Sequence, residues 1–366
     1  MHRLVPLDLP GGPAFVDALR AAWDNGDAVL PIDPRLPRPA VEVLLHALRV
    51  GEPVEDGDAL VVATSGTTGE PKGVVLTHDA VRASAMATSA RVVVDSDRDT
   101  WLACLPLAHV GGLSVVTRAL VTGTPLVVHP GFDAHAVERA AVEEGVTLVS
   151  LVATALRRVD PSLFRTIVLG GSAAPAVRPA NVVATYGMTE TGSGIVYDGS
   201  PLDGVDIDIA VDGGVGTGGG GTGEISVRGP MLLRCYRDGR DPKDADGWYR
   251  TGDVGSWLPD GRLEVRGRID DVIITGGENV WPDAVEAVLA ALPSVHEVAV
   301  VGRDDDEWGQ RVVAVVVPSD ASAPPSLDEV RGAVKEVLGA WAAPRAMELV
   351  DTLPRTSLGK VRRGAL

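Results

Sequence analysis

Short apolar runs alternate with helix-like segments across residues 59–185, and this alternation constrains the fold more than any other feature of the chain. Buried strands are expected for the apolar runs at 59–63, 101–105, 126–129, 147–152, 166–169 and 182–185. Helices are expected between several of them, at 78–91 behind a Thr77 cap, at 113–121 and at 134–144. Strands that alternate with helices usually pair in parallel, because each helix returns the chain to the same end of the sheet. The pattern predicts an α/β fold with a largely parallel sheet.

The pattern changes after Ser200, where turns rich in glycine and aspartate separate short alternating strands such as 224–228 and 262–266. A compact set of elements then ends the chain: a strand after Arg268, a helix from Pro282, strands at 296–301 and 311–317, and a helix from Ser326. Ser326 and Glu329 have the spacing of a capping box, which predicts the start of the last helix.

Two domains are therefore expected. Residues 1–269 would form a large N-terminal α/β domain with mostly parallel sheets plus a β-rich subdomain. Residues 270–366 would form a small, mobile C-terminal α+β domain of about a hundred residues.

Composition excludes several classes of partner. The chain has 33 basic and 50 acidic residues, a formal net charge of −17, and no long Lys/Arg cluster. Nucleic acid and anionic membrane surfaces are therefore not expected as partners. No apolar stretch reaches the length of a membrane span, and the first residues lack the apolar core of a signal peptide. Cys104 and Cys235 lie far apart without metal-ligand spacing, so a soluble cytoplasmic protein is expected.

Residues 64–74, TSGTTGEPKGV, follow an apolar run and combine four hydroxyl side chains, three glycines and one lysine. Glycines let backbone N–H groups approach phosphate oxygens, and Lys72 adds a positive charge. The spacing does not match a Walker A motif, because TTGEPK follows Gly66 where that motif has four residues and then GK[ST]. The segment is predicted to bind polyphosphate through a loop of another kind.

This loop resembles the phosphate loop of the acyl-adenylate-forming superfamily of acyl-CoA synthetases, adenylation domains and luciferases. Further segments resemble motifs of that family and stand in the family's order: 170–175 (GGSAAP), 186–191 (YGMTET), 249–253 (YRTGD), 267–279 (GRIDDVIITGGEN) and 354–360 (PRTSLGK). Each alone has an ordinary explanation, since a single tyrosine can be core and a single charged residue usually faces water. Their shared order, from about residue 60 to the end of the chain, favours the family.

The resemblance implies an ATP site with Mg²⁺. Tyr186 would pack against adenine, Thr189 would touch phosphate, and the Glu190 carboxylate would help hold Mg²⁺. Asp253 would accept hydrogen bonds from both ribose hydroxyls. The other residues that the motifs place at ATP are Thr64, Ser65, Gly66, Thr67, Thr68, Gly69, Lys72, Gly171, Ser172, Ala173, Gly187 and Arg268.

The resemblance also implies a reaction in two steps. A carboxylate attacks the α-phosphorus of ATP to give an acyl-adenylate and pyrophosphate, and coenzyme A, the co-substrate, then displaces AMP. Lys360 would bridge the acyl carboxylate and the α-phosphate while negative charge builds there. The catalytic residues implied are thus Lys360, Glu190 and Thr189.

A swing of the small domain would separate the two steps. Asp270 matches the family's hinge position, and the rotation would withdraw Lys360 from the site. Gly276 and Gly277 would then approach the pantetheine arm of coenzyme A, which two glycines leave room for. An ordinary β-turn is the alternative for these glycines.

Substrate choice is implied by one helix and two loops. Residues 105–113, LPLAHVGGL, resemble the family's gating segment, with His109 beside the acyl pocket. The next helix is apolar apart from Arg118 and small hydroxyls, and a lone arginine there is more often exposed or paired for structural reasons. A basic residue at this point nevertheless resembles the o-succinylbenzoate–CoA ligases of menaquinone synthesis, where it would hold the second carboxylate of the substrate. Residues 188–193 and 274–282 resemble that subfamily as well, and Ser193 would touch the ketone or carboxylate.

The expected function is ATP-dependent ligation of a carboxylic acid, most like 2-succinylbenzoate, to coenzyme A. Two alternatives stay open: an aryl or medium-chain acyl ligase that delivers to coenzyme A or a carrier protein, and an inactive adenylate-binding scaffold or sensor. Only 63 residues precede the phosphate loop, so the large domain is expected to be shortened at its N-terminus. The sequence therefore determines neither one wall of the acyl pocket nor the oligomeric state, and a homodimer is one of the states it allows.

Overall fold

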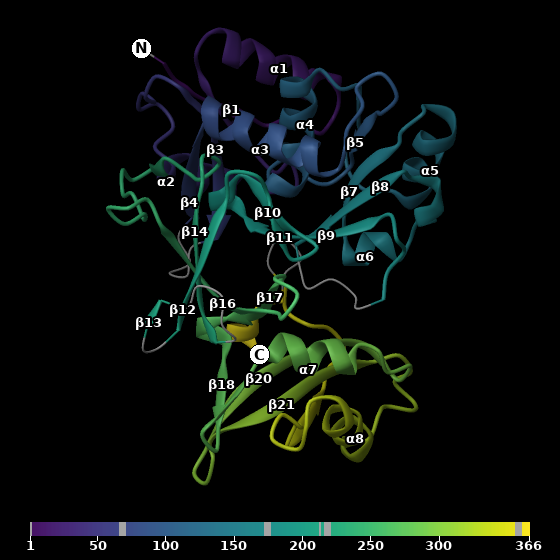
Figure 1. Ribbon diagram of the computed structural model, residues 1–366. Helices are drawn as coiled ribbons and strands as arrows, with labels where there is room; N and C mark the ends of the chain where they lie inside the picture. The colour runs from purple at the N-terminus through teal and green to yellow at the C-terminus, as the bar shows by residue number, and fades with distance from the viewer. Residues whose placement is uncertain (1, 66–70, 172–176, 212–213, 216–220, 356–360) are drawn as a thin grey trace. The chain divides into compact units, whose positions relative to one another are not determined.

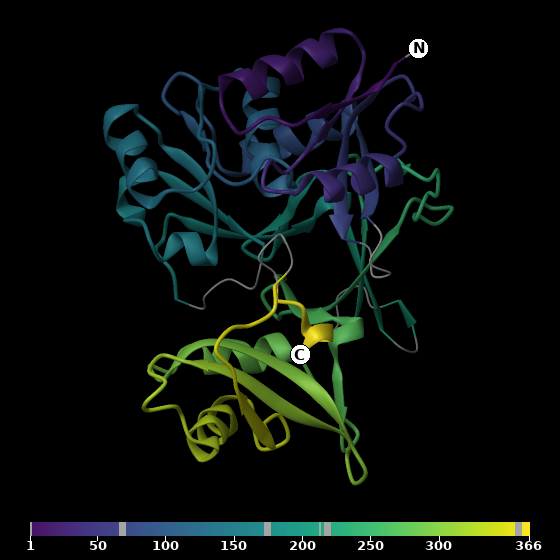
Figure 2. The ribbon, with the colours of Figure 1, turned by 180° about the vertical axis from the view of Figure 1, so that it is seen from behind.

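The computed structural model describes residues 2–65, 71–171, 177–211, 214–215, 221–355 and 361–366. The chain divides into two compact units, and the ribbon is shown from two sides in Figures 1 and 2. Unit 1 comprises Met1–Asp208, Ser226–Arg250 and Asp260–Leu263, and unit 2 comprises Ile209–Ile225, Thr251–Pro259 and Glu264–Leu366. The expected domain boundary between residues 269 and 270 stays a prediction. Among the described residues, no helix combines the length and the apolar character that crossing a membrane requires.

The largest sheet of unit 1 has seven strands in the order β11-β10-β9-β8-β7-β5-β6. The strands are β5 (Trp101–Ala103), β6 (Leu126–Val128), β7 (Leu148–Val152), β8 (Thr166–Gly170), β9 (Val182–Met188), β10 (Ser193–Tyr197) and β11 (Ser200–Pro201). All neighbours from β6 to β9 pair in parallel, and β10 and β11 add an antiparallel edge. The predicted α/β fold with a largely parallel sheet is confirmed.

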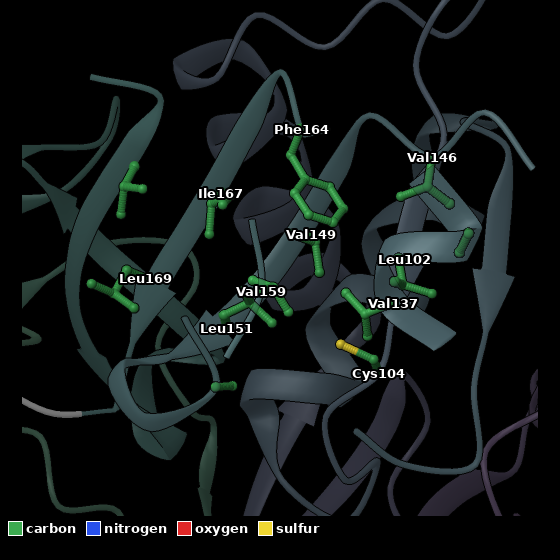
Figure 3. Close-up of a cluster of buried hydrophobic side chains, with 13 residues drawn as sticks. Leu102, Cys104, Val137, Val146, Val149, Leu151, Val159, Phe164, Ile167 and Leu169 are labelled. Carbon is green, nitrogen blue, oxygen red and sulfur yellow. The ribbon is translucent and has the colours of Figure 1, made fainter. Parts of the chain in front are cut away.

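Helices cover both faces of this sheet. Alternate residues of a strand point to opposite faces, so Leu102 of β5 packs against α5 (Ala134–Glu143), whereas its neighbour Trp101 faces α4 (Val110–Thr122). Figure 3 shows the cluster on the α5 side, to which Val149 and Leu151 of β7, Ile167 and Leu169 of β8, and Phe164 belong. Burial of each such side chain stabilises the fold by about 1.5–3 kcal/mol.

Helices α3 (His78–Arg91) and α4 pack against each other beside this sheet. The predicted Thr77 cap is confirmed, because the Thr77 hydroxyl accepts a hydrogen bond from the Ala80 amide at 3.1 Å. Helix α4 begins at Val110, three residues before the predicted start at residue 113. Two glycines open this helix and weaken the sequence signal, yet Gly112 is needed there: a Cβ atom would lie 2.4 Å from the Leu105 carbonyl oxygen.

The first sheet of unit 1 has the order β1-β2-β3-β4-β15, and of its strands only β3, the apolar run at 59–63, was predicted. Its strands are β1 (Leu4–Leu7), β2 (Ala28–Pro31), β3 (Asp58–Ser65), β4 (Pro71–Thr77) and β15 (Cys235–Tyr236), and the helices α1 (Pro13–Asp24) and α2 (Arg38–Ala47) lie between its first strands in sequence. β3, β4 and β15 pair antiparallel, so a segment near residue 235 adds to a hairpin formed more than 150 residues earlier.

A third sheet has the order β13-β12-β14-β16-β17 and corresponds to the predicted β-rich part. Its strands are β12 (Asp206–Val211), β13 (Gly214–Val215), β14 (Thr222–Arg228), β16 (Tyr249–Trp257) and β17 (Leu263–Arg268). The strands predicted at 224–228 and 262–266 are the cores of β14 and β17.

The C-terminal part of unit 2 is the predicted α+β arrangement. Its elements are β18 (Ile273–Thr275), β19 (Glu278–Val280), α7 (Pro282–Leu289), β20 (Val295–Asp305), β21 (Gly309–Pro318), α8 (Leu327–Val337) and β22 (Ala346–Leu349). Helices α7 and α8 cover one face of the β20–β21 pair, and Leu353, Val361 and Leu366 from the chain's end pack on the other. The Ser326 hydroxyl caps α8 at the Glu329 amide, as predicted. The reciprocal half of the capping box does not form, because the Glu329 carboxylate accepts from Ser294 instead.

One arginine ties the end of the chain to the start of unit 2's α+β part. Arg363 lies in the 3-10 turn η4 (Arg363–Ala365) and pairs with Asp271 at 2.9 Å, with Glu286 at 2.9 Å and with Asp283. Burial alone would lower the pKa of Arg363, but the carboxylates, led by Glu286, raise it above its usual value. The guanidinium therefore stays charged and neutralises three acids at once.

Replacing this arginine is expected to weaken unit 2. Arg363→Met should lower the free energy of opening of the β20 and β21 amides by about 2–3 kcal/mol, because three carboxylates lose their shared cation. Native-state hydrogen exchange measures this quantity. Arg303→Met is the matched control in the same unit. It breaks a pair with the single half-exposed Glu348 and a bond to the Leu366 carbonyl, and it should cost less than about 1 kcal/mol. Equal effects of the two substitutions would contradict the account of Arg363.

Candidate functional site

The predicted phosphate loop lies between two paired strands. β3 and β4 form an antiparallel hairpin in which Thr64 pairs with Lys72 and Ser65 with Pro71. Gly66, Thr67, Thr68 and Gly69 lie outside the described residues. The prediction that Lys72 stands in a loop is wrong: the residue belongs to β4, where an antiparallel partner fixes its backbone. A strand holds a cation at a defined place more firmly than a loop would.

The YGMTET segment is positioned as predicted, at the end of a strand. Tyr186 and Gly187 end β9, and Thr189 and Glu190 form the 3-10 turn η2 (Thr189–Thr191) that follows. The close approach of β10 requires Gly187, because a Cβ atom there would lie 2.2 Å from the Ser193 carbonyl oxygen. Glu190 is half-buried. Gly171, with a φ of +87°, follows β8, whereas Ser172 and Ala173 lie outside the described residues.

Tyr236 connects the segments that were predicted to bind phosphate and metal, and was not itself predicted. Its hydroxyl donates to Glu190 Oε1 at 3.0 Å, and Lys72 Nζ lies 5.9 Å from its ring centroid. The structure thus brings Lys72 of the phosphate hairpin and Glu190 of the metal motif to one side chain. The sequence carried no signal for this, because Tyr236 stands in a short segment, RCYRDG, with no chemistry-bearing pattern.

The donor set fits Mg²⁺ held together with a nucleotide. Mg²⁺ usually takes one or two protein carboxylates and completes its shell with substrate phosphates and water. Glu190 supplies one such carboxylate, and Tyr236 is its only side-chain hydrogen-bond donor within the described part of the chain. The described part of the chain also contains no group of three or more His, Cys, Asp or Glu side chains that could hold a metal ion. A metal at Glu190 would therefore depend on the phosphates of ATP.

Asp253 and Arg268 form a pair of their own in unit 2. Arg268 Nη1 donates to Asp253 Oδ1 at 3.1 Å and to the Thr251 carbonyl oxygen at 2.9 Å. The Thr251 hydroxyl accepts from the Asp253 amide at 3.0 Å, which orients the aspartate on β16. These contacts hold the carboxylate that was predicted to bind ribose. The proposed grouping of Asp253 with the residues of unit 1 remains a prediction.

The predicted hinge and coenzyme A residues also belong to unit 2. Asp270 is exposed in the 3-10 turn η3 (Ile269–Asp271). Gly276 and Gly277 form the two-residue turn between β18 and β19, with φ values of +58° and +86°. A turn with two positive φ values is the type that closes tight hairpins and favours glycine at both places. The glycines are therefore explained by the turn, and their contact with coenzyme A stays a prediction. Lys360 lies outside the described residues.

Arg118 occupies the interior of unit 1. Its side chain is 1% exposed and its guanidinium carbon lies 4.7 Å from the centre of the Trp101 ring. Nη2 donates to Ser193 Oγ at a long 3.4 Å, whereas Nε and Nη1 have no hydrogen-bond partner within the described part of the chain. Burial lowers the pKa of Arg118 from its ordinary value. Arg118 is therefore buried, and no acid pairs with it among the described residues.

Arg118 lies on a face of α4 that lines a small cavity. Val110, Ser114, Thr117 and Arg118 recur at helical spacing and line a cavity that is completed by α3, β3, β4 and Gly192. The cavity holds about 10 Å³ of free space, roughly room for one water. The space is too small for an aromatic acid. The hydrogen bond between Ser193 Oγ and Ser114 Oγ is long, at 3.3 Å, and hydroxyl hydrogen bonds of this length are weak.

His109 is the residue before the first turn of this helix, and its side chain makes no capping hydrogen bond. Its Nε2 is buried and has no hydrogen-bond partner in the described ranges. Burial lowers the pKa of His109, although the nearby Asp33 carboxylate opposes the shift. The ring is therefore neutral at pH 7 and suited to lie beside an apolar or aromatic group.

Family models match most of the chain. A model described as AMP-binding enzyme matches residues 47–237, and a model described as AMP-binding enzyme C-terminal domain matches residues 284–360. A probable 2-succinylbenzoate–CoA ligase of Mycobacterium tuberculosis is 39% identical, and the match covers 98% of this chain and 97% of the relative. The 2-succinylbenzoate–CoA ligase of Bacillus licheniformis is 38% identical, with coverage of 85% of this chain and 70% of the relative.

Solved structures match as well. The o-succinylbenzoate CoA synthetase of Bacillus subtilis in complex with its acyl-adenylate intermediate superposes with a TM-score of 0.89 at 29% identity, over 99% of this chain and 87% of the other. The same synthetase in complex with ATP and a magnesium ion gives a TM-score of 0.88 at 29% identity, over 100% and 89% of the two chains.

Proposed function

This chain belongs to the AMP-binding enzyme family, and from that premise we propose that it joins 2-succinylbenzoate to coenzyme A with ATP as the activating substrate. It is an AMP-forming acid–thiol ligase, and we place its reaction in menaquinone biosynthesis. The likeness to 2-succinylbenzoate–CoA ligases over nearly the whole chain supports the acid, and the likeness to a synthetase that holds an acyl-adenylate supports the two-step route.

The observation that carries the choice of acid is the buried guanidinium of Arg118, whose Nε and Nη1 have no hydrogen-bond partner among the described residues. A buried cation without an anion costs several kcal/mol, so a protein retains one where a ligand supplies the missing charge. 2-Succinylbenzoate has two carboxylates. One must react with ATP, and the other can take Nε and Nη1 of Arg118 through a bidentate pair. A benzoate or a fatty acid has no second carboxylate to offer.

In the first half-reaction, an oxygen of the reacting carboxylate attacks the α-phosphorus, and the bond from that phosphorus to the bridging oxygen of pyrophosphate breaks. Lys360 would hold the carboxylate and the α-phosphate together, and Lys72 with Thr64, Ser65, Gly66, Thr67, Thr68 and Gly69 would hold the β and γ phosphates. Glu190 would hold Mg²⁺, which supplies positive charge for the phosphates and the leaving pyrophosphate. Thr189, next to Glu190 on η2, would bind phosphate through its hydroxyl.

The YGMTET and YRTGD motifs would hold adenine and ribose, respectively. Tyr186 would stack on the base beside Gly171, Ser172, Ala173 and Gly187, and Asp253 would accept hydrogen bonds from the ribose hydroxyls. The Arg268 contact orients the Asp253 carboxylate for that task. These placements are proposals that follow from family membership and from the local geometry of each motif.

In the second half-reaction, the sulfur of coenzyme A attacks the acyl carbonyl carbon, and the bond from that carbon to the oxygen of AMP breaks. A rotation at Asp270 would withdraw Lys360 and bring the Gly276–Gly277 turn to the pantetheine arm. We place the enzyme in the cytoplasm, because its cysteines Cys104 and Cys235 are both free, as suits a reducing compartment.

Product analysis tests the proposal. With 2-succinylbenzoate, ATP, Mg²⁺ and coenzyme A, the protein should form AMP and a thioester of the mass of 2-succinylbenzoyl-CoA, as measured by liquid chromatography and mass spectrometry. Formation of ADP, or of an acyl-adenylate that is never transferred to coenzyme A, would contradict the proposed ligation.

A further inference from the structure

Tyr236 lies where the phosphate hairpin and the metal turn of unit 1 meet. β15 pairs antiparallel with β4, so that Tyr236 stands opposite Val74, two residues along the strand from Lys72. The amide of Leu233, three residues before Tyr236, donates to the Glu190 carbonyl oxygen at 2.8 Å. The segment around residue 235 is thus bound by backbone hydrogen bonds to both of the elements that carry the charged groups.

The hydroxyl and the ring face of Tyr236 contact groups of opposite charge. The hydroxyl donates to the Glu190 carboxylate at 3.0 Å, while Lys72 Nζ lies 5.9 Å and the Arg240 guanidinium carbon 4.8 Å from the ring centroid. An aromatic face attracts cations, and a phenol donates well to a carboxylate. Burial, with the charge of Glu190, raises the pKa of Tyr236, so the hydroxyl keeps its proton at neutral pH.

We propose that Tyr236 is a positioning residue that orients Glu190 for Mg²⁺ and holds Lys72 for phosphate, while it keeps the two from pairing with each other. This inference rests on the proposed function. A direct Lys72–Glu190 ion pair would occupy the charges that ATP and Mg²⁺ need, and no such pair forms in the described ranges. The ring holds the ammonium by its face and the hydroxyl holds the carboxylate by its edge, so each charged group stays available to its ligand. Hydrogen-bond donors behind a metal ligand typically change metal affinity by about 10- to 100-fold.

ATP binding with and without Mg²⁺ separates the two parts of this role. In Tyr236→Phe the ring is retained and only the hydroxyl is lost. The dissociation constant for ATP in EDTA should therefore be unchanged, while the factor by which Mg²⁺ tightens ATP binding should fall about tenfold. In Tyr236→Leu the ring is lost as well, and binding of ATP in EDTA should also weaken, because Lys72 loses its support. Isothermal titration calorimetry on the full-length protein measures both constants without any turnover.

Tyr197→Phe is the matched control. Tyr197 is also a buried tyrosine of unit 1, 2% exposed, and its hydroxyl shares a hydrogen bond with Thr88 at 3.1 Å. This substitution should leave both dissociation constants unchanged. An undiminished Mg²⁺ effect in Tyr236→Phe, or an equal loss in Tyr197→Phe, would overturn the role of Tyr236. A wild-type protein whose ATP binding ignores Mg²⁺ would instead contradict the metal role of Glu190 in the proposed function.

Discussion

Lys360→Ala should lose acyl-adenylate formation while it retains thioester formation from a supplied acyl-adenylate. The first step gathers negative charge between the attacking carboxylate and the α-phosphate, and Lys360 is the cation proposed to lie there. Loss of one such stabilising group typically slows a reaction by about a hundred- to a thousandfold. The second step needs no cation at that place, so its rate should stay within about threefold. Exchange of radiolabelled pyrophosphate into ATP measures the first step, and release of AMP from synthetic acyl-adenylate with coenzyme A measures the second.

Lys335→Ala is the control for this substitution. Lys335 is an exposed residue in the last turn of α8, within the same unit, and its removal should change neither half-reaction. A loss of both half-reactions in Lys360→Ala, to the same extent, would contradict the proposal that Lys360 leaves the site between the steps.

Arg118→Met should abolish recognition of 2-succinylbenzoate without weakening the fold. The substitution removes the charge that is proposed to pair with the second carboxylate, so KM for 2-succinylbenzoate should rise about a hundredfold, equivalent to about 2.7 kcal/mol. KM for benzoate, which has no second carboxylate, should change little. The melting temperature should stay equal or rise, because methionine fills the volume and no longer buries an unpaired cation. Steady-state kinetics and thermal unfolding on the same preparations measure both effects.

Arg165→Met shows what a structural arginine does. Arg165 holds the buried Asp99 through two bonds, from Nε at 2.9 Å and from Nη2 at 2.7 Å. Its removal leaves that carboxylate without its cation and should lower the free energy of unfolding by about 2 kcal/mol. KM for 2-succinylbenzoate and KM for benzoate should change to the same extent. If Arg118→Met instead destabilises the protein like Arg165→Met and slows both acids equally, Arg118 is a structural residue.

The fold was predictable where local chemistry decides it. The caps at Thr77 and Ser326 depend on one hydroxyl and one nearby amide, so they could be predicted from the sequence. The parallel strands are continuous apolar runs, so their positions could be predicted from the sequence. Strand β4 was missed because its first residues are Pro71, Lys72 and Gly73, which are typical of loops. The antiparallel pairing with β3 overrides that local preference.

The candidate site could be predicted only in part, because a contact between residues far apart in the sequence leaves no local pattern. Glu190 and Lys72 could be predicted as site residues, because each stands in a local motif, YGMTET and TSGTTGEPKGV respectively. Tyr236 is brought to them by the pairing of β15 with β4, a contact between residues more than 150 positions apart that leaves no local pattern. Arg118 was predicted as a site residue, but its burial follows from the packing of α4 on Trp101, which no single segment encodes.

A carboxylate panel tests the central claim most directly. The specificity constant kcat/KM should be measured from pyrophosphate release, with ATP, Mg²⁺ and coenzyme A held constant, for 2-succinylbenzoate, benzoate, a substituted benzoate and medium-chain fatty acids. We predict that 2-succinylbenzoate exceeds every monocarboxylate by about a hundredfold or more, because only that acid supplies an anion to Arg118. A monocarboxylate that reacts as well as 2-succinylbenzoate would contradict the claim, and a protein that binds ATP but activates none of these acids would contradict the ligase function itself.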